Sequence, residues 1–276
     1  MHIFFATDGS ASARFAQAQI LAMPWRSPVQ ITVMAAVHIP PPPFTSFVSS
    51  AQQAFDAALA TLRRDAEVRA EEVLARTRYA LEASMASVAT RMHAGSPGVV
   101  NHARCSVLLA KTPPKRTGRY LLALDDSRYA VAVLRWLREL DLSKGAWIHL
   151  VKVFRSTEDF PDPDGRDLVC GRDRRAPAMF APWGDASEVL EAMCEEGIDT
   201  RVARVTVEVR FGHEAPEILA SIRKFDPELL VMGAKGHYST AASPLGSVAR
   251  KVIDHAPCSV LIVRPSGPGF PGPDSD

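Results

Sequence analysis

Glycine and serine residues between positions 233 and 247 form the most distinctive chemical pattern of this 276-residue chain. The segment GAKG, with Gly233 and Gly236 at its ends, is followed by nine residues and then by Gly246 and Ser247. Glycines let the backbone approach an anion closely, and amide groups at the start of the next helix can point at phosphate oxygens. The pattern therefore predicts a phosphate-binding loop and, with it, a nucleotide-binding function.

A carboxylate is the second candidate for chemistry. Asp125 directly follows the short apolar segment 120–124, and the glycine loop follows the apolar run 229–232. In a doubly wound sheet, ligands bind beyond the carboxyl ends of the strands, so both features should face one crevice. We expect Asp125 to accept hydrogen bonds from an adenine amino group or a ribose hydroxyl, while the loop amides and the Ser247 hydroxyl bind phosphates. Lys235 either adds positive charge there or is a solvated loop residue.

The elements that must position these residues alternate along the second half of the chain. Strands are expected at 120–124, 146–154, 202–209, 229–232 and 259–263, and helices at 128–140, 185–196, 214–224 and 246–255. The apolar face of the first of these helices is expected to include Val131, Leu134, Leu137 and Leu140. Five strands alternating with four helices predict a parallel, doubly wound sheet covered on both faces. A segment rich in Asp, Pro, Gly and Arg at 155–181 is too long for a simple connection.

The chain also matches itself, which indicates an internal repeat. FATDGS at 5–10 matches LALDDS at 122–127, and Gly95 matches Gly212, both at a spacing of 117; HARCSVL at 102–108 matches HAPCSVL at 255–261 at a spacing of 153. The difference between the two spacings means that the first copy lacks 36 residues between Gly95 and His102. The missing interval corresponds to the part of the second copy that holds the phosphate loop.

The first copy otherwise begins like the second. Strands are expected at 3–6, 30–37, 88–93 and 106–110, and helices at 11–23 and 50–84, the latter a cover helix with apolar positions that include Phe55, Leu59, Leu62, Val68 and Val73. Loss of an internal strand would leave backbone groups of its neighbours unpaired. We therefore hypothesise that strand 106–110 moves inward beside strand 3–6 and makes a four-stranded sheet. The alternative is a partly disordered first copy.

Composition excludes several classes of protein. Lys and Arg total 32 against 31 for Asp and Glu, so no overall charge favours nucleic acid or a membrane surface. No apolar segment is long enough to cross a bilayer, and no signal segment opens the chain. The cysteines show no metal or disulfide spacing, which predicts reduced thiols in a cytoplasmic protein, with Cys105 and Cys258 as buried small residues. We find no candidate catalytic residues and no metal ligands.

The motifs LALDDS, VMGAKG, LGSVARKV and HAPCSVLIVRP together resemble those of the universal stress protein family, of the UspA-like type, in its tandem form. The likeness is specific from about residue 118 to 265 and extends to the first copy without the loop. It implies tandem Rossmann-like, adenine nucleotide alpha hydrolase-like domains, each a three-layer α/β/α sandwich with a parallel sheet, the first truncated. The domains would be 1–112 and 117–266, followed by a disordered tail at 267–276.

In that family, this glycine spacing marks the branch that binds ATP. The resemblance implies that Asp125 and Val153 lie beside the adenosine and that the phosphates are surrounded by the loop. The implied site residues are Ala123, Asp125, Val153, Met232, Gly233, Gly236, Gly246, Ser247 and Val248. ATP, with Mg²⁺, is the expected ligand, and hydrolysis is expected to be slow at most.

The expected function is that of a stress-response or regulatory nucleotide sensor acting on an unidentified protein partner. One alternative is an interaction module whose loop binds no nucleotide, and another is a slow nucleotide hydrolase. The two copies should pack as a pseudo-dimer within the chain through the last strands, 106–110 and 259–263. Two chains can then associate further as a homodimer.

Overall fold

The computed structural model describes residues 2–37, 49–83, 87–94, 105–115, 117–125, 127–142, 145–155, 193, 198, 203–236 and 245–265. The expected disordered tail, most of the insertion and most of the helix expected at 185–196 lie outside these residues. The chain divides into two compact units, Met1–Leu21 with Ser27–Val99 and Ala22–Arg26 with Val100–Asp276. In the described part, no helix is both long enough and apolar enough to cross a membrane.

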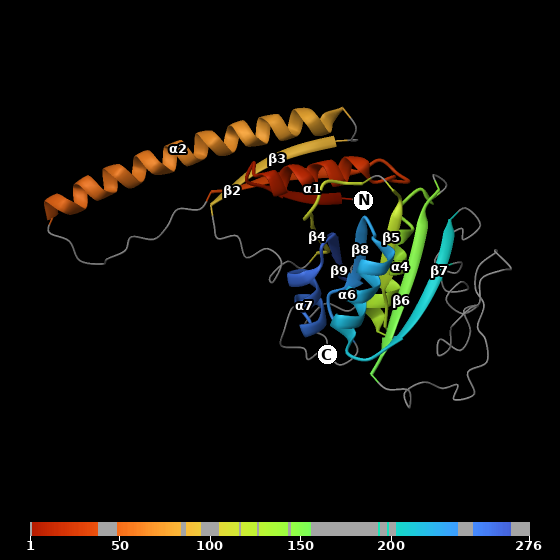
Figure 1. The fold of residues 1–276 in the computed structure, drawn as a ribbon. Coiled ribbons are helices and arrows are strands. Elements are labelled where there is room, and N and C mark those ends of the chain that lie inside the picture. The colour runs from red at the N-terminus through yellow and green to blue at the C-terminus, as the bar shows by residue number, and fades with distance from the viewer. Residues whose placement is uncertain are drawn as a thin grey trace, which may run out of the picture. The chain divides into compact units, whose positions relative to one another are not determined.

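The first unit is built on parallel strands. In chain order its elements are β1 (His2–Thr7), α1 (Ala11–Ala22), β2 (Gln30–Val37), α2 (Ser49–Glu82) and β3 (Ser87–Ala94). Among the described residues, its sheet has three strands in the order β1-β2-β3, all parallel. The helix α2 runs along this sheet, as Figure 1 shows, and contacts β2 and β3.

The helix α2 is much longer than the strands that it covers. At 34 residues it spans about 50 Å, against roughly 26 Å for an eight-residue strand. Its buried positions, Leu74, Thr77 and Leu81, follow helical spacing in the C-terminal half. Leu62 and Val68, two of the apolar positions of this cover helix, are 57% and 49% exposed, so apolar character alone does not place them against the sheet.

The second unit holds the larger sheet. Its elements are β4 (Val107–Leu109), β5 (Arg119–Ala123), α4 (Arg128–Leu137), β6 (Trp147–Phe154), β7 (Arg204–Phe211), α6 (Glu214–Phe225), β8 (Leu229–Gly233), α7 (Ser247–His255) and β9 (Ser259–Val263). The strand order is β4-β9-β8-β5-β6-β7, and every pair except β4 with β9 is parallel. The expected parallel, doubly wound fold is therefore confirmed.

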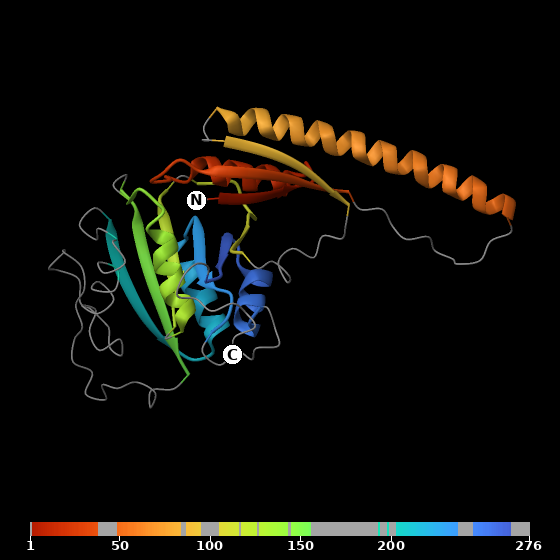
Figure 2. The same cartoon turned by 180° about the vertical axis from the view of Figure 1, so that it is seen from behind.

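Helices cover both faces of this sheet. The helices α6 and α7 share one apolar cluster with residues such as Leu121 and Val151, while α4 shares the cluster of the opposite face with Leu122 and Leu150. Figures 1 and 2 show the sheet from its two sides, with α6 and α7 on one face and α4 on the other. This arrangement places the chain turns that follow β5, β6 and β8 at one edge of the sheet.

The helix α4 begins where the sequence predicts it. Ser127 is its N-cap residue, and its side chain accepts a hydrogen bond from the Tyr129 amide at 3.2 Å. Val131 was expected on the buried face but is 39% exposed. It precedes the fully buried Val133 by two residues, which is roughly 200° of rotation around a helix, so its side chain points away from the sheet.

The strand β4 does not join the first sheet. It pairs antiparallel with β9, with Val107 opposite Ile262 and Leu109 opposite Val260. The hypothesis of a four-stranded first domain, with strand 106–110 beside strand 3–6, is therefore wrong. Pairing with β9 satisfies the backbone groups of what would otherwise be an edge strand. The expectation that the last strands of the two copies contact each other is confirmed.

The strand registers support the repeat. The strands β5, β6 and β7 each begin 117 residues after β1, β2 and β3 (119 against 2, 147 against 30, and 204 against 87), and they pair in the same register. Leu121 is buried beneath α6 and α7, whereas its counterpart Phe4 is 58% exposed. The 36 residues missing from the first copy fall in the interval that carries α6 and much of α7 in the second.

Candidate functional site

A cavity of about 520 Å³ lies at the carboxyl ends of β5, β6 and β8. Its volume falls within the range of small-molecule sites, roughly 300 to 1,000 Å³. The chain leaves β5 toward β6 on one side and returns through β8 on the other, so the cavity lies where strand order reverses. Its lining includes all nine residues expected from the sequence: Ala123, Asp125, Val153, Met232, Gly233, Gly236, Gly246, Ser247 and Val248.

The Asp125 side chain is held by a local turn. Its Oδ1 accepts hydrogen bonds from the Ser127 amide at 3.1 Å and from the Ser127 hydroxyl at 2.5 Å. Its Oδ2 lies toward the glycine loop, because a Cβ placed on Gly236 would come within 2.9 Å of it. The carboxylate and the loop, far apart in sequence, therefore lie side by side.

The first copy keeps the same turn. The Ser10 amide donates to Asp8 Oδ1 at 2.9 Å. Hydrogen bonds from the Ser10 side chain and backbone hold the pKa of the Asp8 carboxyl below its usual value. The strand-end Asp and Ser thus form a stable turn in both units, with or without a phosphate loop.

The glycine loop is closed by backbone hydrogen bonds. The Ala234 amide donates to the Val263 carbonyl at 2.9 Å, and the Gly246 amide donates to the Ala234 carbonyl at 2.8 Å. These bonds bring GAKG and the Gly246-Ser247 pair together, although residues 237–244 between them lie outside the described part. Lys235 also lines the cavity.

Gly233 has a packing role of its own. A Cβ at this position would lie 2.6 Å from the Tyr129 Cβ and 3.2 Å from the Lys235 carbonyl oxygen. Neither neighbour can move aside easily, because one is the Cβ of a residue in α4 and the other is a backbone oxygen. A glycine at position 233 is therefore required by the contact between β8 and α4, whether or not a ligand binds.

The N-terminus of α7 opens into the cavity. Its N-cap residue, Gly246, offers no side chain to the first-turn amide groups, and the first turn carries no acidic residue. Ser247, Val248 and Ala249 supply these amides and line the cavity. The first amides of a helix lack partners within the helix and carry the positive end of its dipole. This end of the cavity is therefore suited to an anion.

Two lining residues form an ion pair that was not predicted from the sequence. Arg155 follows β6, Glu214 begins α6, and the Arg155 Nε donates to Glu214 Oε1 at 2.7 Å. Burial opposes ionisation of Glu214, but the hydrogen bond and charge of Arg155 outweigh it and lower the pKa of this carboxyl. Arg155 follows β6 and Glu214 lies three residues after β7, but only the adjacency of these two strands in the sheet brings the residues together.

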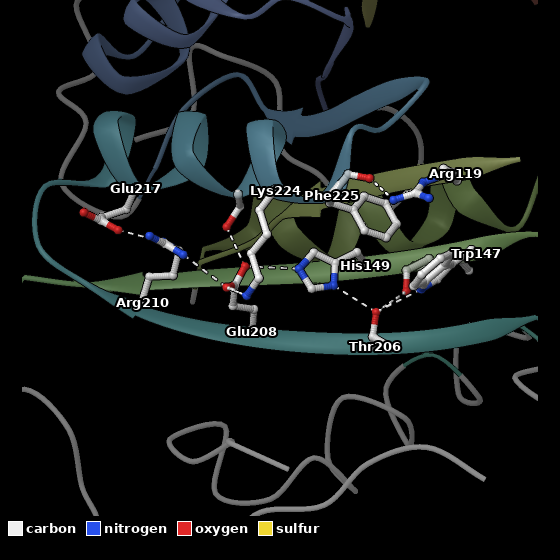
Figure 3. A network of polar contacts seen from close by, with 11 residues as sticks. Arg119, Trp147, His149, Thr206, Glu208, Arg210, Glu217, Lys224 and Phe225 are labelled. Atoms are coloured by element: carbon white, nitrogen blue, oxygen red, sulfur yellow. Dashed lines mark hydrogen bonds and ion pairs between the residues drawn. The ribbon is translucent and has the colours of Figure 1, made fainter. Parts of the chain in front are cut away.

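A polar network lies between α6 and the strands β6 and β7 (Figure 3). Its centre is Glu208, which accepts hydrogen bonds from Ser221 and Lys224 of α6, each at 2.7 Å, and lies 3.2 Å from His149 Nε2. The contact with His149 and the bonds from the α6 residues overcome burial and hold the pKa of Glu208 far below its usual value. Arg210 extends the network to Glu217 at 2.6 Å.

Other sequence expectations meet mixed outcomes. Cys258 is buried, and burial raises the pKa of its thiol to about 11, but Cys105 is exposed, contrary to expectation. Cys105 precedes β4, which is the edge strand of the second sheet. Across the described ranges, His, Cys, Asp and Glu side chains form no group of three or more that could hold a metal ion.

Fold and cavity together define a doubly wound α/β protein whose site lies at the reversal of strand order. Residues 117–264, just over half of the chain, match the model of the universal stress protein family. The chain belongs to this family.

Individual relatives match the second copy. A universal stress protein of Mycobacterium tuberculosis is 25% identical over 145 residues, which are 52% of this chain and 47% of the relative. One from Thermus aquaticus is 28% identical over 145 residues, 52% of this chain and 96% of the relative. The match thus spans about half the length of the mycobacterial relative.

One solved structure covers nearly the whole chain. The crystal structure of a universal stress protein from Archaeoglobus fulgidus covers 95% of this chain and 96% of its own, with a TM-score of 0.62 and 18% identity. At this identity the likeness shows a shared fold. It agrees with the presence of two α/β sheets in one chain.

Proposed function

We propose that this protein binds ATP in the cavity of its second unit and acts as a cytoplasmic regulatory protein of the stress response. One observation carries the proposal: a carboxylate and an uncapped helix N-terminus line the same cavity of about 520 Å³. Asp125 supplies the acceptor and α7 supplies the anion-binding amides. A nucleotide has both kinds of group, hydroxyl and amino donors at one end and phosphate oxygens at the other.

The chemistry of the lining supports the proposed orientation of the ligand in the cavity. Phosphates belong at Gly246 and Ser247, where the α7 dipole is positive. They do not belong at Asp125, whose negative charge would repel them, so this carboxylate faces the ribose or the base. Apolar side chains between the two ends, such as Val153 and Met232, exclude water from the nucleoside.

We expect Mg²⁺ to bind as a complex with the triphosphate of ATP. The carboxylates in the lining are Asp125 and Glu214, and the hydrogen bonds of both already engage neighbouring residues. The first copy keeps the Asp8 turn but lacks the loop sequence, so we propose one nucleotide per chain. ATP occupancy would bias one conformation of the second unit and so change its affinity for a partner.

A second candidate function is that of an interaction module without a nucleotide. One observation favours it: Gly233 is explained by its contact with Tyr129, so part of the loop sequence would be retained for packing alone. A slow nucleotide hydrolase is the third possibility, and it shares the binding site with the first.

Thermal unfolding separates these candidates. A ligand at 100 times its dissociation constant adds about 2.7 kcal/mol to the free energy of unfolding. We expect saturating ATP and Mg²⁺ to raise the Tm of the second unit by roughly 5 °C or more. Asp125→Ala should reduce this rise. An unchanged Tm at millimolar ATP would favour the interaction module, and ATP consumption well above background would favour the hydrolase.

A further inference from the structure

Arg155 and Glu214 lie at the end of the cavity opposite the α7 N-terminus. The strand order β9-β8-β5-β6-β7 places the glycine loop after β8, Asp125 after β5, Arg155 after β6 and Glu214 after β7. Two strand spacings, roughly 10 Å, therefore separate the end of β8 from that of β6. The cavity runs across the strand ends from an anion-binding end to the Arg155–Glu214 pair.

The Arg155 guanidinium is held in place by Glu214. The Arg155 Nε lies 2.7 Å from Glu214 Oε1, and the Glu214 side chain is only 25% exposed. Glu214 is the first residue of α6, where the helix dipole favours its negative charge. The Arg155 side chain is itself 60% exposed, and the ion pair orients its guanidinium beside the cavity.

The network of Figure 3 fixes α6 itself. Glu217, one turn beyond Glu214, binds Arg210 of β7 at 2.6 Å. At the other end of the helix, Ser221 and Lys224 bind Glu208. The position of Glu214 therefore depends on a helix that is tied to the sheet at two places.

We propose that Arg155, positioned by Glu214, recognises the base of the bound nucleotide. The proposal rests on the function proposed above. A planar guanidinium stacks on the face of an aromatic ring, and a heterocyclic base offers such a face. Phosphate is disfavoured at this end by the Glu214 carboxylate and is favoured at the other end by α7. In the first copy, the position equivalent to Arg155 is His38, and the interval that corresponds to α6, which begins with Glu214, is the one that lacks 36 residues.

The test compares a ligand that has a base with one that lacks it. We would measure the affinity of the full chain for ATP directly and for inorganic tripolyphosphate by competition with ATP, both with Mg²⁺. Arg155→Gln should weaken ATP binding about tenfold and change tripolyphosphate binding less than twofold. Arg155→Lys keeps the positive charge but replaces the planar guanidinium with an ammonium group, so its affinities should resemble those of Arg155→Gln. Glu214→Gln should weaken ATP binding by a smaller factor, with tripolyphosphate again unaffected.

Several results would overturn the proposal. Equal losses for both ligands would make Arg155 a phosphate-binding residue, and recovery of ATP affinity in Arg155→Lys would show that charge alone matters. Unchanged ATP affinity in Arg155→Gln would remove any role for the residue. Each of these results leaves ATP binding by the wild type intact, whereas a wild-type chain that binds no ATP contradicts the proposed function itself.

Discussion

Gly246→Asp is expected to weaken ATP binding by about 100-fold, or ~2.7 kcal/mol, and to leave the fold intact. Gly246 has φ −67° and ψ 156°, which any residue adopts, and Asp is among the preferred N-cap residues. The new carboxylate would accept the first-turn amides of α7 and place a negative charge where we expect phosphate. The loss of affinity would therefore arise from competition and repulsion, with no loss of the helix.

Gly246→Asn is the matched control. Asn is nearly the same size and also caps helices, but it carries no charge. We expect its affinity for ATP to lie between those of the wild type and the Asp variant, about tenfold below the former, and circular dichroism should show all three proteins folded. Equal affinity in all three would contradict the assignment of the α7 N-terminus to phosphate.

Glu208→Gln should lower the free energy of unfolding by about 2 to 3 kcal/mol at pH 7, the second large effect. The Glu208 side chain is only 14% exposed and accepts charged and neutral hydrogen bonds from three elements. A neutral amide removes the negative charge that Lys224 and Arg210 share at Oε1. Its NH₂ group would also stand where Oε2 now meets the Ser221 hydroxyl and His149 Nε2. Glu71→Gln, an exposed position of α2, should change stability little.

The pH dependence of this effect has a definite sign. The pKa of Glu208 in the folded protein lies far below its unfolded value of about 4.3, so its contribution is fully present above that value. The contribution is lost as the pH falls toward the folded pKa. Urea unfolding at pH 7 and pH 3 should therefore show the difference between wild type and Glu208→Gln shrinking in acid. A difference that is constant or grows would contradict this account of the network.

Buried apolar runs made strands of both units predictable from sequence. The expected strands 30–37 and 259–263 agree with β2 and β9 residue for residue, because polar or turn residues bound each run. The position of β4 was mispredicted, because a run of three apolar residues such as Val107–Leu109 does not indicate which strand it pairs with. Periodicity identifies a strand but does not identify its neighbour.

Helix length and helix rotation explain which apolar positions of the helices are exposed. Leu62 has helical spacing but lies in the half of α2 where none of the side chains that the structure describes is buried, because the helix is longer than its sheet. Val131 has the spacing of Leu134 and Leu137 but lies beyond the edge of the face that they define. The burial of apolar residues at the margin of a periodic pattern is therefore the hardest to predict from the sequence.

Only part of the candidate site could be predicted from the sequence. The glycine spacing and Asp125 carry their own chemistry, so the residues expected there do line one cavity. Arg155 and Glu214 carry no motif, and 58 residues separate them. Their contact arises only because β6 and β7 are adjacent parallel strands that end at the same edge. A site assembled from neighbouring strand ends requires the sheet order, which sequence periodicity does not provide.

Calorimetric titration of the full chain with ATP and Mg²⁺ measures both whether the chain binds the nucleotide and how many it binds. We expect one equivalent of ATP per chain, because the loop that we assign to phosphate occurs once, in the second copy. Two equivalents would contradict a silent first copy. No measurable binding at millimolar ATP would contradict the nucleotide site and leave the interaction module as the better description.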